Sequence, residues 1–489
     1  METILACLTW LSDHQGAIFL CALPIAIPLI LFQVLPLLVL MERRGASFIQ
    51  DRIGPNRAGV NLSAKALGAL ALRKDAIAGV FAHERDPQAT GLRLRAFGML
   101  FNMADLVKIL FKEHFIAPFA EGFFYKWAPV IPVGIALFST ALIPWFAPFS
   151  YVVSTGGFGH VVGQAIDAHS GLLALFAVGS LGVYGIVLGS WASNSKYALL
   201  GGMRSSAMMI SYEVSMGLSV LGLLLIYGSF SLTEGVLWQE SHTWGAVVQP
   251  VGFVLFLIAM FAEANRNPFD VAEGESEIVA GFHTEFNGIR FMLIMTAEYF
   301  HVMLASVLLA VLFLGGWSIL PVPGFGSEWV RDNLGLVLGI GLIAGGVLKL
   351  GFAWLIAGRR RHYARINASD KAQRLREYGF YTALLSGAGL AFIAGGIASI
   401  LLLDPEPITI IAPTGEKIFA TWVNLLTAVV QFKIILVKAL MFCWLFVWVR
   451  WTLPRFRYDQ IMGLGWKVLL NIALVNLLVT ALIAKLVRG

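Results

Sequence analysis

Apolar runs of roughly 20 residues recur along the chain, and this is the length that an α-helix needs to cross a bilayer. Only 13% of the 489 residues are charged and the mean hydropathy is +0.79, whereas about 25% of the residues in a soluble domain are charged. Backbone polar groups inside a bilayer must be bonded within the chain, so such segments fold as helices. The sequence therefore predicts an all-α polytopic membrane protein.

Ten candidate transmembrane spans of about 17 to 26 residues follow from these runs. They begin near Ile18, Ala128, Gly171, Met208, Ala246, Phe291, Leu334, Phe380, Val423 and Val468. No Lys or Arg precedes Arg43, and the first run is too long for the core of a signal peptide. We therefore interpret it as the first spanning helix.

The distribution of Lys and Arg tests this count, because cytoplasmic loops are enriched in basic residues. With ten spans, 28 of the 35 basic residues fall in loops on one side, four fall on the other side and three lie within spans. The richest loops are 41–126 and 357–377. This asymmetry predicts that both termini lie outside the cytoplasm. It also accounts for the net charge of +6, so we do not expect nucleic acid as a partner.

The first long basic loop contains an amphipathic segment, GMLFNMADLVKILFKEHFIAP at 98–118. Apolar side chains recur there near helical spacing, on the face opposite the charged ones: Leu100, Met103, Val107 and Leu110 against Asp105, Lys108 and Lys112. This pattern predicts a helix that lies at the membrane interface. The mixed, charged stretch 61–97 in the same loop is expected to be a peripheral excursion.

Two patterns that suggest cofactor binding are better explained otherwise. Three cysteines, Cys7, Cys21 and Cys443, cannot supply the four thiolates of an iron–sulfur cluster, so electrons must come from a partner. Residues 339–344, GIGLIA, match a dinucleotide-binding pattern but lie within an apolar span. Helix packing through small residues, as in Gly341-x-x-x-Gly345, is the better interpretation. The histidines show no metal-ligand spacing, and no metal site is expected.

Acidic residues gather at the end of the fifth span and in the loop that follows it. Six of them fall within 23 residues: Glu263, Asp270, Glu273, Glu275, Glu277 and Glu285. Glu298 follows inside the sixth span, and Glu213 lies inside the fourth. A solvated cytoplasmic loop is the simplest explanation of such a charge run.

Three observations favour a function for these acids. Glu263 and Glu298 have apolar neighbours in the sequence, where an ionised acid costs roughly 2.5–3.5 kcal/mol or more. Apolar residues alternate with the loop acids, and in a helix Asp270, Glu273 and Glu277 would share one face. Crowded carboxylates repel one another and can exchange protons near neutral pH. The pattern therefore predicts a proton-handling path that enters from the cytoplasm.

The stretch FAEANRNPFDVAEGESEIVAGFHTEF at 261–286 resembles the signature of the H subunit of bacterial respiratory NADH:quinone oxidoreductase (complex I). That subunit is equivalent to mitochondrial NADH dehydrogenase subunit 1. Three further blocks resemble the family in its own order: MERRGASFIQDRIGPNRAG, SNSKYALLGGMRSSAMMISYEVSMGLS and FVWVRWTLPRFRYDQIMGLGWKVLL. The resemblance covers most of 41–60, 98–118, 190–300 and 440–485.

The resemblance implies a membrane subunit that forms part of the quinone chamber and starts a path of acids toward the proton pumps. The implied proton-path residues are Glu213, Glu263, Asp270, Glu273, Glu275, Glu277, Glu285 and Glu298. The implied quinone-binding residues are Arg43, Arg44, Arg52, Arg266 and Phe269. The stretch 455–459 matches a cytoplasmic anchor that we expect to dock to partner subunits.

The resemblance also implies where the redox chemistry takes place. The chain itself would bind no cofactor, and quinone would be its substrate. NADH, FMN and iron–sulfur clusters would belong to partner subunits. The expected partners are the peripheral subunits of the quinone site, the neighbouring membrane subunits and membrane lipid. The expected location is the bacterial inner membrane, with many passes.

This chain departs from the family pattern in two places. About 35 extra residues separate the GPNR block from the Asp105 helix, and roughly 90 separate the Glu298 helix from the Lys438 helix. The second insertion contains two spans beyond the usual eight. We therefore expect three regions: a membrane domain at 1–315 with the chamber and acidic motifs, an inserted segment at 316–420, and the last two family spans at 421–489.

Two other functions fit parts of the pattern. The homologous membrane subunit of a membrane-bound hydrogenase or formate hydrogenlyase would have the same architecture without quinone, but the GPNR and RFRYDQ blocks favour the quinone enzyme. A stand-alone ion transporter would use the acids for coupling. Activity without partner subunits would distinguish the transporter.

Overall fold

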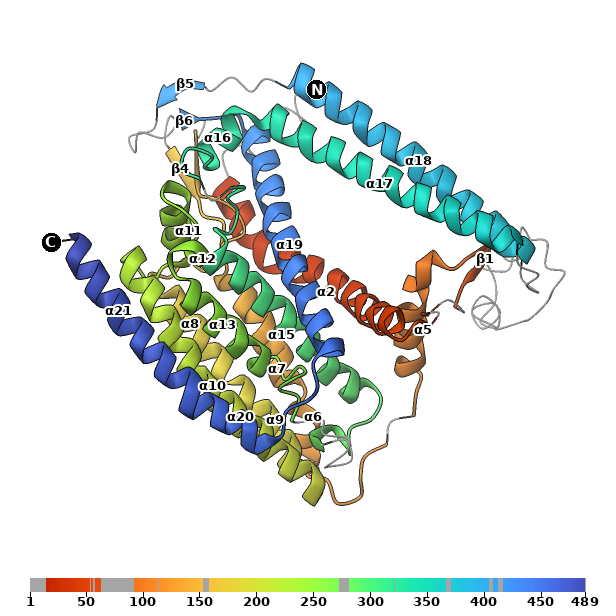
Figure 1. Ribbon diagram of the computed structural model, residues 1–489, viewed down its shortest axis with the longest axis vertical. Helices are drawn as coiled ribbons and strands as arrows, with labels where there is room; N and C mark the ends of the chain where they lie inside the picture. The colour runs from red at the N-terminus through yellow and green to blue at the C-terminus, as the bar shows by residue number, and fades with distance from the viewer. Residues whose placement is uncertain are drawn as a thin grey trace. The chain divides into compact units, whose positions relative to one another are not determined.

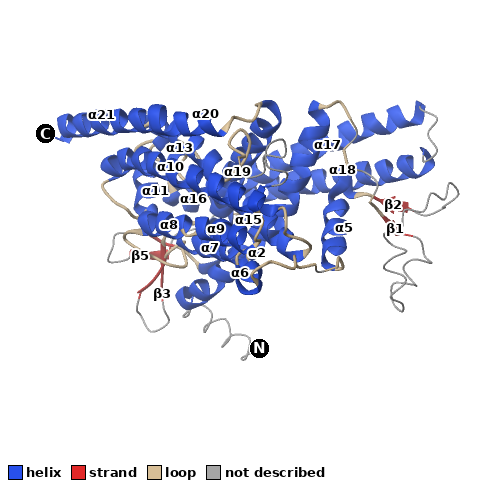
Figure 2. Cartoon of the chain, turned by 90° about the horizontal axis from the view of Figure 1, so that it is seen from below, coloured by secondary structure: helices blue, strands red, loops and turns tan. Residues whose placement is uncertain are grey.

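The computed structural model describes residues 15–52, 54–55, 58–62, 92–113, 115–152, 158–271, 281–320, 322–365, 371–403, 408–411 and 417–488. Helices dominate this part of the chain (Figure 2). Its β-structure consists of three short antiparallel pairs: β1 (Val60–Leu62) with β2 (Leu92–Leu94), β3 (Phe149–Val152) with β4 (Phe158–Val161), and β5 (Ile408–Ile411) with β6 (Lys417–Ile418). The all-α class is confirmed.

Within the described residues, eight helical segments are long and apolar enough to cross a membrane. They are α2 (Gln15–Ile49), α8 and α9 together (Gly171–Ser180 and Gly182–Ala192), α10 (Lys196–Tyr227), α15 (Ile289–Phe313), α17 (Leu334–Arg365), α18 (Lys371–Leu402), α19 (Thr421–Thr452), and α20 (Tyr458–Gly463) continued by η3 (Leu464–Leu469) and α21 (Leu470–Arg488). A polytopic membrane protein is confirmed.

The other two expected spans are shorter helices, α7 (Val130–Leu142) and α13 (Pro250–Glu263), of 13 and 14 residues. Proline explains two of their ends. Ile143 is extended, as expected for the residue before Pro144. Pro250 starts α13, where its missing N–H costs nothing. Helices thus occupy all ten expected positions, and eight of them have spanning length.

Helix α10 begins at Lys196, well before the expected start near Met208. The buried residues of this extension are all small, and two of them are serines: Ala198, Gly201, Gly202, Ser205 and Ser206. A Cβ on Gly201 would lie 2.8 Å from the Cα of Gly281, and Ser205 donates a hydrogen bond of 2.9 Å to Asn265. Hydropathy does not identify this part of the helix because these residues pack against protein.

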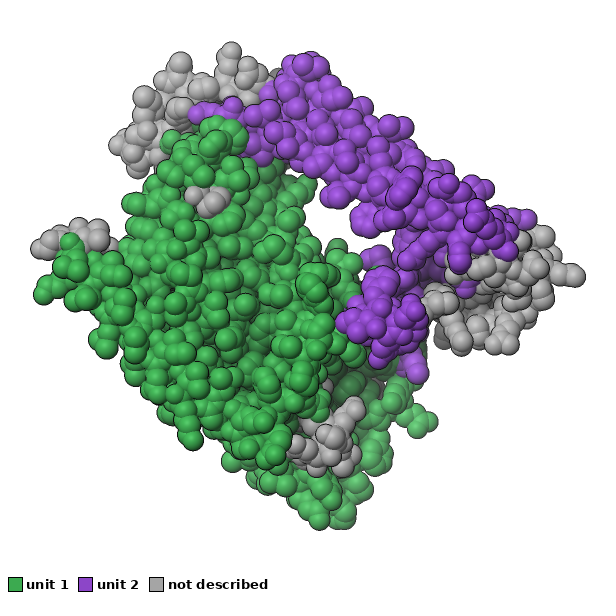
Figure 3. Space-filling view, in the orientation of Figure 1, with its two compact units in different colours: residues 1–41, 109–329, 407–489 green, residues 42–108, 330–406 purple. Residues whose placement is uncertain are grey.

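The chain divides into two compact units, shown in green and purple in Figure 3. Unit 1 comprises residues 1–41, 109–329 and 407–489. In it α10 packs against α9, α13 and α21, and α15 packs against α7 and α19 (Figure 1). Its shorter helices are α6 (Gly122–Trp127), α11 (Leu232–Ser241), α12 (Gly245–Val248), η2 (Gly281–His283) and α16 (Ser327–Asp332), which ends beyond the unit. The central helices α10, α13 and α15 carry Glu213, Glu263 and Glu298, respectively.

Unit 2 comprises residues 42–108 and 330–406, and its largest element is the α17–α18 pair (Figure 1). A Cβ on Gly339 would lie 2.7 Å from the carbonyl oxygen of Gly396, and one on Gly346 would lie 2.7 Å from that of Gly389. The prediction that small residues allow these helices to pack closely is therefore correct, but it named other glycines. The close contacts are made by Gly339 and Gly346, whereas Gly341 faces open space.

The predicted amphipathic segment forms helix α5 (Met99–Leu110) of unit 2, after the short η1 (Ala96–Gly98). Its exposed apolar residues are Met99, Met103, Leu106 and Leu110, which fall on one stripe at helical spacing. This stripe shares only Met103 and Leu110 with the expected face. At the first residue of η1, the backbone N–H of Ala96 donates a hydrogen bond of 2.7 Å to the hydroxyl of Tyr381 in α18.

Candidate functional site

Two cavities in unit 1 are lined by the acids of the central helices. The first, of about 40 Å³, is lined by Glu298, Glu263, Asn265 and His301 among other residues. The second, of about 50 Å³, is lined by Glu213, Glu263 and His301 among others. A water molecule needs about 10–15 Å³ of such volume. Each cavity therefore has room for more than one water molecule.

The two cavities share three lining residues, Glu263, Ala264 and His301. Glu298 lines only the first cavity and Glu213 only the second. The carboxylates therefore follow one another in the order Glu298, Glu263, Glu213, and they come from α15, α13 and α10. All three are partly buried. Carboxylates inside a membrane helix bundle typically mark ion or proton paths.

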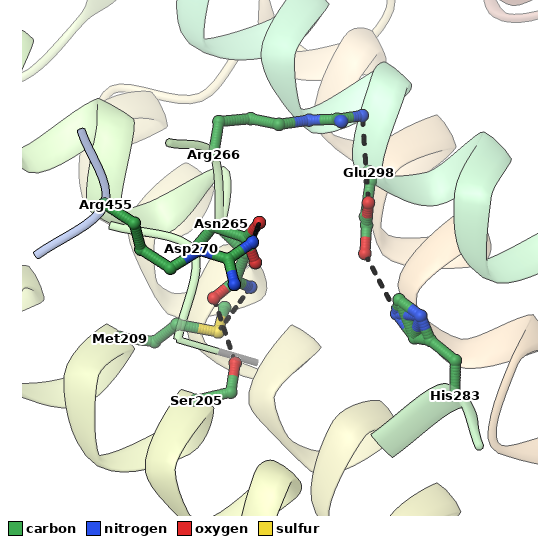
Figure 4. A network of polar contacts seen from close by, with 8 residues as sticks. All are labelled: Ser205, Met209, Asn265, Arg266, Asp270, His283, Glu298 and Arg455. Atoms are coloured by element: carbon green, nitrogen blue, oxygen red, sulfur yellow. Dashed lines mark hydrogen bonds and ion pairs between the residues drawn. The ribbon is translucent and has the colours of Figure 1, made fainter. Parts of the chain in front are cut away.

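Glu298 is held by two side chains from the preceding loop (Figure 4). Arg266 Nη2 lies 3.7 Å from one of its oxygens, and His283 Nε2 lies 3.4 Å from the other. The Arg266 guanidinium also lies over the ring of Tyr299, 4.4 Å from its centre. Only 12% of the Glu298 side chain is exposed. The loop thus supplies the positive charge next to the first acid of the row.

His283 contributes to this contact as a neutral group at neutral pH. It lies in η2, outside the spanning helices, and burial lowers its pKa to about 4. Desolvation disfavours the charged imidazolium. The contact of 3.4 Å with Glu298 is therefore a polar contact at neutral pH, and Arg266 is the cation of the group.

The loop between α13 and α15 is fixed to other elements at several points. Asn265, with a φ of 47°, accepts a hydrogen bond of 2.9 Å from Ser205 of α10. Asp270 is buried and forms an ion pair of 2.8 Å with Arg455 (Figure 4). These contacts come from segments far apart in the sequence, and they hold the stretch that carries Arg266.

Phe269, which the resemblance assigned to quinone binding, is buried. Its ring packs edge-on against Tyr212 at 5.3 Å and against Phe456 at 5.9 Å. Tyr212 in turn donates a hydrogen bond of 2.9 Å to the carbonyl oxygen of Ile461. The aromatic cluster joins α10, the α13–α15 loop and the start of α20.

The structure separates those predicted proton-path residues that it describes into three groups. Glu213, Glu263 and Glu298 line the two cavities. Asp270 pairs with Arg455. Glu285 lines neither cavity among the described residues, and its backbone carbonyl accepts a hydrogen bond of 2.5 Å from Tyr125. Glu273, Glu275 and Glu277 lie outside the described residues.

The three predicted quinone-binding arginines at 43, 44 and 52 all lie in unit 2. Arg43 forms an ion pair of 2.8 Å with Asp105 of α5. Arg44 donates a hydrogen bond of 2.5 Å to the carbonyl oxygen of Phe97, and Arg52 donates one of 2.6 Å to Gln50. Helix α5 thus contacts Arg43, and η1 before it contacts Arg44.

Two histidines of the site are not assigned by the sequence. His283 lies in the loop signature, which the resemblance treats only as a block. His301 fits a packed polar residue as well as a functional one when the sequence is taken alone. Its spacing of three residues from Glu298 on an apolar helix is a usable signal, because such pairs lie on one helical face.

Lys438 has a structural role at the far end of α15. Its ammonium donates hydrogen bonds of 2.6, 2.9 and 2.5 Å to the carbonyl oxygens of Leu314, Gly316 and Ser318. A cation is favourable where the last carbonyls of a helix lack partners. This contact explains a lysine within a span and fixes the end of the helix that carries Glu298.

Within the described part of the chain, no three His, Cys, Asp or Glu side chains are grouped so that they could hold a metal ion.

The fold and the site define a polytopic membrane protein whose helix bundle contains a row of carboxylates joined by cavities. A family model described as NADH dehydrogenase matches residues 21–358 and 375–481. The chain belongs to this family.

Several relatives are named as the H subunit of NADH-quinone oxidoreductase. The one from Bdellovibrio bacteriovorus is 33% identical over 480 residues, which cover 94% of each chain. The one from Deinococcus deserti is 34% identical over 460 residues, covering 94% of this chain and 81% of the relative. The one from Solibacter usitatus is 37% identical over 402 residues, covering 79% of this chain and 86% of the relative. The resemblance inferred from the sequence blocks is confirmed.

Proposed function

We propose that the chain is a membrane subunit of a proton-translocating NADH:quinone oxidoreductase. It contributes to the quinone chamber and couples quinone reduction to proton transfer through its acids. The names of the relatives support the enzyme. The observation that carries the coupling role is the pair of cavities that share Glu263 and His301, because Glu298 lines only the first and Glu213 only the second.

The proposed coupling element is Arg266. It lies in the same loop as Phe269, which the resemblance assigns to quinone binding, and 3.7 Å from Glu298. Reduction of quinone creates negative charge that attracts a nearby guanidinium. When Arg266 is drawn from Glu298, the carboxylate loses its counter-charge and takes up a proton. Glu298 then passes this proton through the first cavity to Glu263, and the second cavity leads on to Glu213.

Other parts of the proposal rest on the resemblance. The loop acids Asp270, Glu273, Glu275, Glu277 and Glu285 supply protons from the cytoplasm, and Arg43, Arg44 and Arg52 form the wall of the chamber. NADH, FMN and iron–sulfur clusters are held by partner subunits, which dock at the cytoplasmic loops. The chain lies in a bacterial inner membrane with both termini outside the cytoplasm.

Glu263→Gln in the assembled complex tests the proposed function. Glu263 lines both cavities, so a side chain that cannot carry the proton should interrupt the path. We expect NADH:quinone reductase turnover and proton pumping in proteoliposomes to fall on the order of a hundredfold. The matched control is Glu234→Gln, because Glu234 is an exposed acid on α11. Wild-type turnover and pumping in assembled Glu263→Gln complex would contradict the proposal.

A further inference from the structure

His301 lies where the two cavities meet. It is on α15, three residues after Glu298, and it lines the first cavity with Glu298 and the second with Glu213. The opposite wall is formed where α8 ends at Ser180 and α9 begins at Gly182. A Cβ on Gly182 would lie 4.0 Å from Cε1 of the imidazole. The ring therefore faces the break between these two helices, and Ser180 lies on the side of the second cavity.

The imidazole is open to the cavities. His301 is partly exposed, although the same helix is buried from Val302 to Phe313. Within the described part of the chain, no protein group forms a hydrogen bond or an ion pair with it. Its two nitrogens are therefore available to groups inside the cavities, and a neutral imidazole accepts at one nitrogen while it donates at the other.

Other titratable groups at these cavities are all carboxylates. They are Glu298 on α15, Glu263 on α13 and Glu213 on α10. The lining residues from α7, α8 and α9 are not titratable. His301 is thus the one basic side chain among acids along the described walls. A base between acids can take a proton from one and give it to another without the two carboxylates having to meet.

We propose that His301 is a proton relay that joins the two cavities, in addition to the carboxylates. A proton from the side of Glu298 forms a new N–H bond on one ring nitrogen. The N–H bond on the other nitrogen breaks, and its proton leaves toward Glu213. The ring returns to neutral in its other tautomer, and a flip of the ring restores the first one. No net charge is left on His301, and no electron is transferred.

This inference rests on the proposed proton path and is tested with His301→Gln in the assembled complex. Glutamine keeps a hydrogen-bonding side chain but cannot take up and release a proton. We expect coupled turnover and pumping to fall on the order of tenfold or more, and the solvent deuterium isotope effect on turnover to rise above the wild-type value. A side chain with only a packing role would leave the isotope effect unchanged.

The matched control is Leu309→Met, a buried residue further along the same helix that lines neither cavity. Leu and Met exchange with little change in volume, so this variant should keep wild-type turnover. If His301→Gln does not assemble, His301→Asn gives the same test with a smaller side chain. An assembled variant of either kind with wild-type pumping would overturn the relay. Comparison with Glu263→Gln separates the two proposals: if that variant is inactive while His301→Gln is normal, the path stands without His301.

Discussion

The carboxylate of Glu377 in α18 accepts a hydrogen bond of 2.7 Å from the backbone N–H of Arg95, which lies 282 residues earlier in the chain. The second oxygen of Glu377 lies 3.6 Å from the guanidinium of Arg95, and both side chains are buried. One residue further on, Ala96 donates to Tyr381, and Phe97 packs on the same ring at 4.7 Å. The turn at Arg95 to Phe97 and helix α18 thus belong to one unit.

Tyr381→Phe should release the backbone N–H of Ala96. The hydroxyl is the acceptor of that N–H, and a buried group left without its partner costs about 1–3 kcal/mol. We expect amide hydrogen exchange at Ala96 to become roughly tenfold faster or more. Exchange measured by mass spectrometry on the purified complex checks this. Leu384→Met is the control, because Leu384 is exposed on the same helix. Unchanged exchange at Ala96 would show that this bond does not hold the turn.

Gly339→Ala and Gly346→Ala should weaken the α17–α18 pair, whereas Gly341→Ala should not. The added Cβ would lie 2.7 Å from a carbonyl oxygen at either of the first two positions, and Gly341 faces open space. Overpacking of this kind costs roughly 1–3 kcal/mol. Disulfide cross-linking between cysteines placed on the two helices measures the effect. Equal cross-linking yields in all three variants would contradict the glycine contacts.

Arg455 and Asp270 should show energetic coupling. Asp270 is buried and Arg455 is about one-third exposed, with 2.8 Å between them. The coupling free energy of this pair should therefore exceed that of a fully exposed pair. We expect a coupling of about 1 kcal/mol. A double-mutant cycle with Arg455→Gln and Asp270→Asn, read by thermal unfolding of the complex, gives this number. Additive effects would show that the pair contributes nothing.

The neutral state of His283 predicts a pH dependence of stability. Its pKa is about 4 in the folded chain, and the ordinary value is 6.5. Between these values the unfolded chain binds the proton and the folded chain does not, so stability falls as the pH drops from about 6.5 toward 4. The unfolding temperature should therefore fall less steeply with decreasing pH in His283→Gln than in the wild type. His169→Gln, at an exposed site, should keep the wild-type slope. If His283→Gln and the wild type show the same slope, His283 is not the source of this pH dependence of stability.

Topology can be tested at the end of α17. Arg361 is exposed there, in the loop with seven basic residues, so a cysteine at 361 should be labelled only from the cytoplasmic side. A cysteine in place of the exposed Ser241, in a loop without basic residues, should be labelled only from outside. Both would be placed in a chain whose three native cysteines are replaced. The reverse pattern would invert the proposed orientation.

The sequence predicts those features that depend on neighbours along the chain. Apolar run length places a helix at all ten positions, and polarity in an apolar context identifies Glu213, Glu263 and Glu298. Contacts between distant segments are not predictable in this way. Arg266 and Glu298 are 32 residues apart, and nothing in the spacing of the loop says which acid the arginine faces. The start of α10 is not predicted for a similar reason, because hydropathy does not distinguish serines that face protein from serines that face water.

The glycine pairs of α17 and α18 show what holds these two helices together. The two helices pack on each other through backbone contacts at Gly339 with Gly396 and Gly346 with Gly389, so most of what they need lies within one stretch of the gene. The turn from Arg95 to Phe97 also depends on this pair of helices, because its backbone N–H groups donate to Glu377 and Tyr381. Removal of the hairpin would therefore also take these acceptors away from the backbone N–H groups of Arg95 and Ala96.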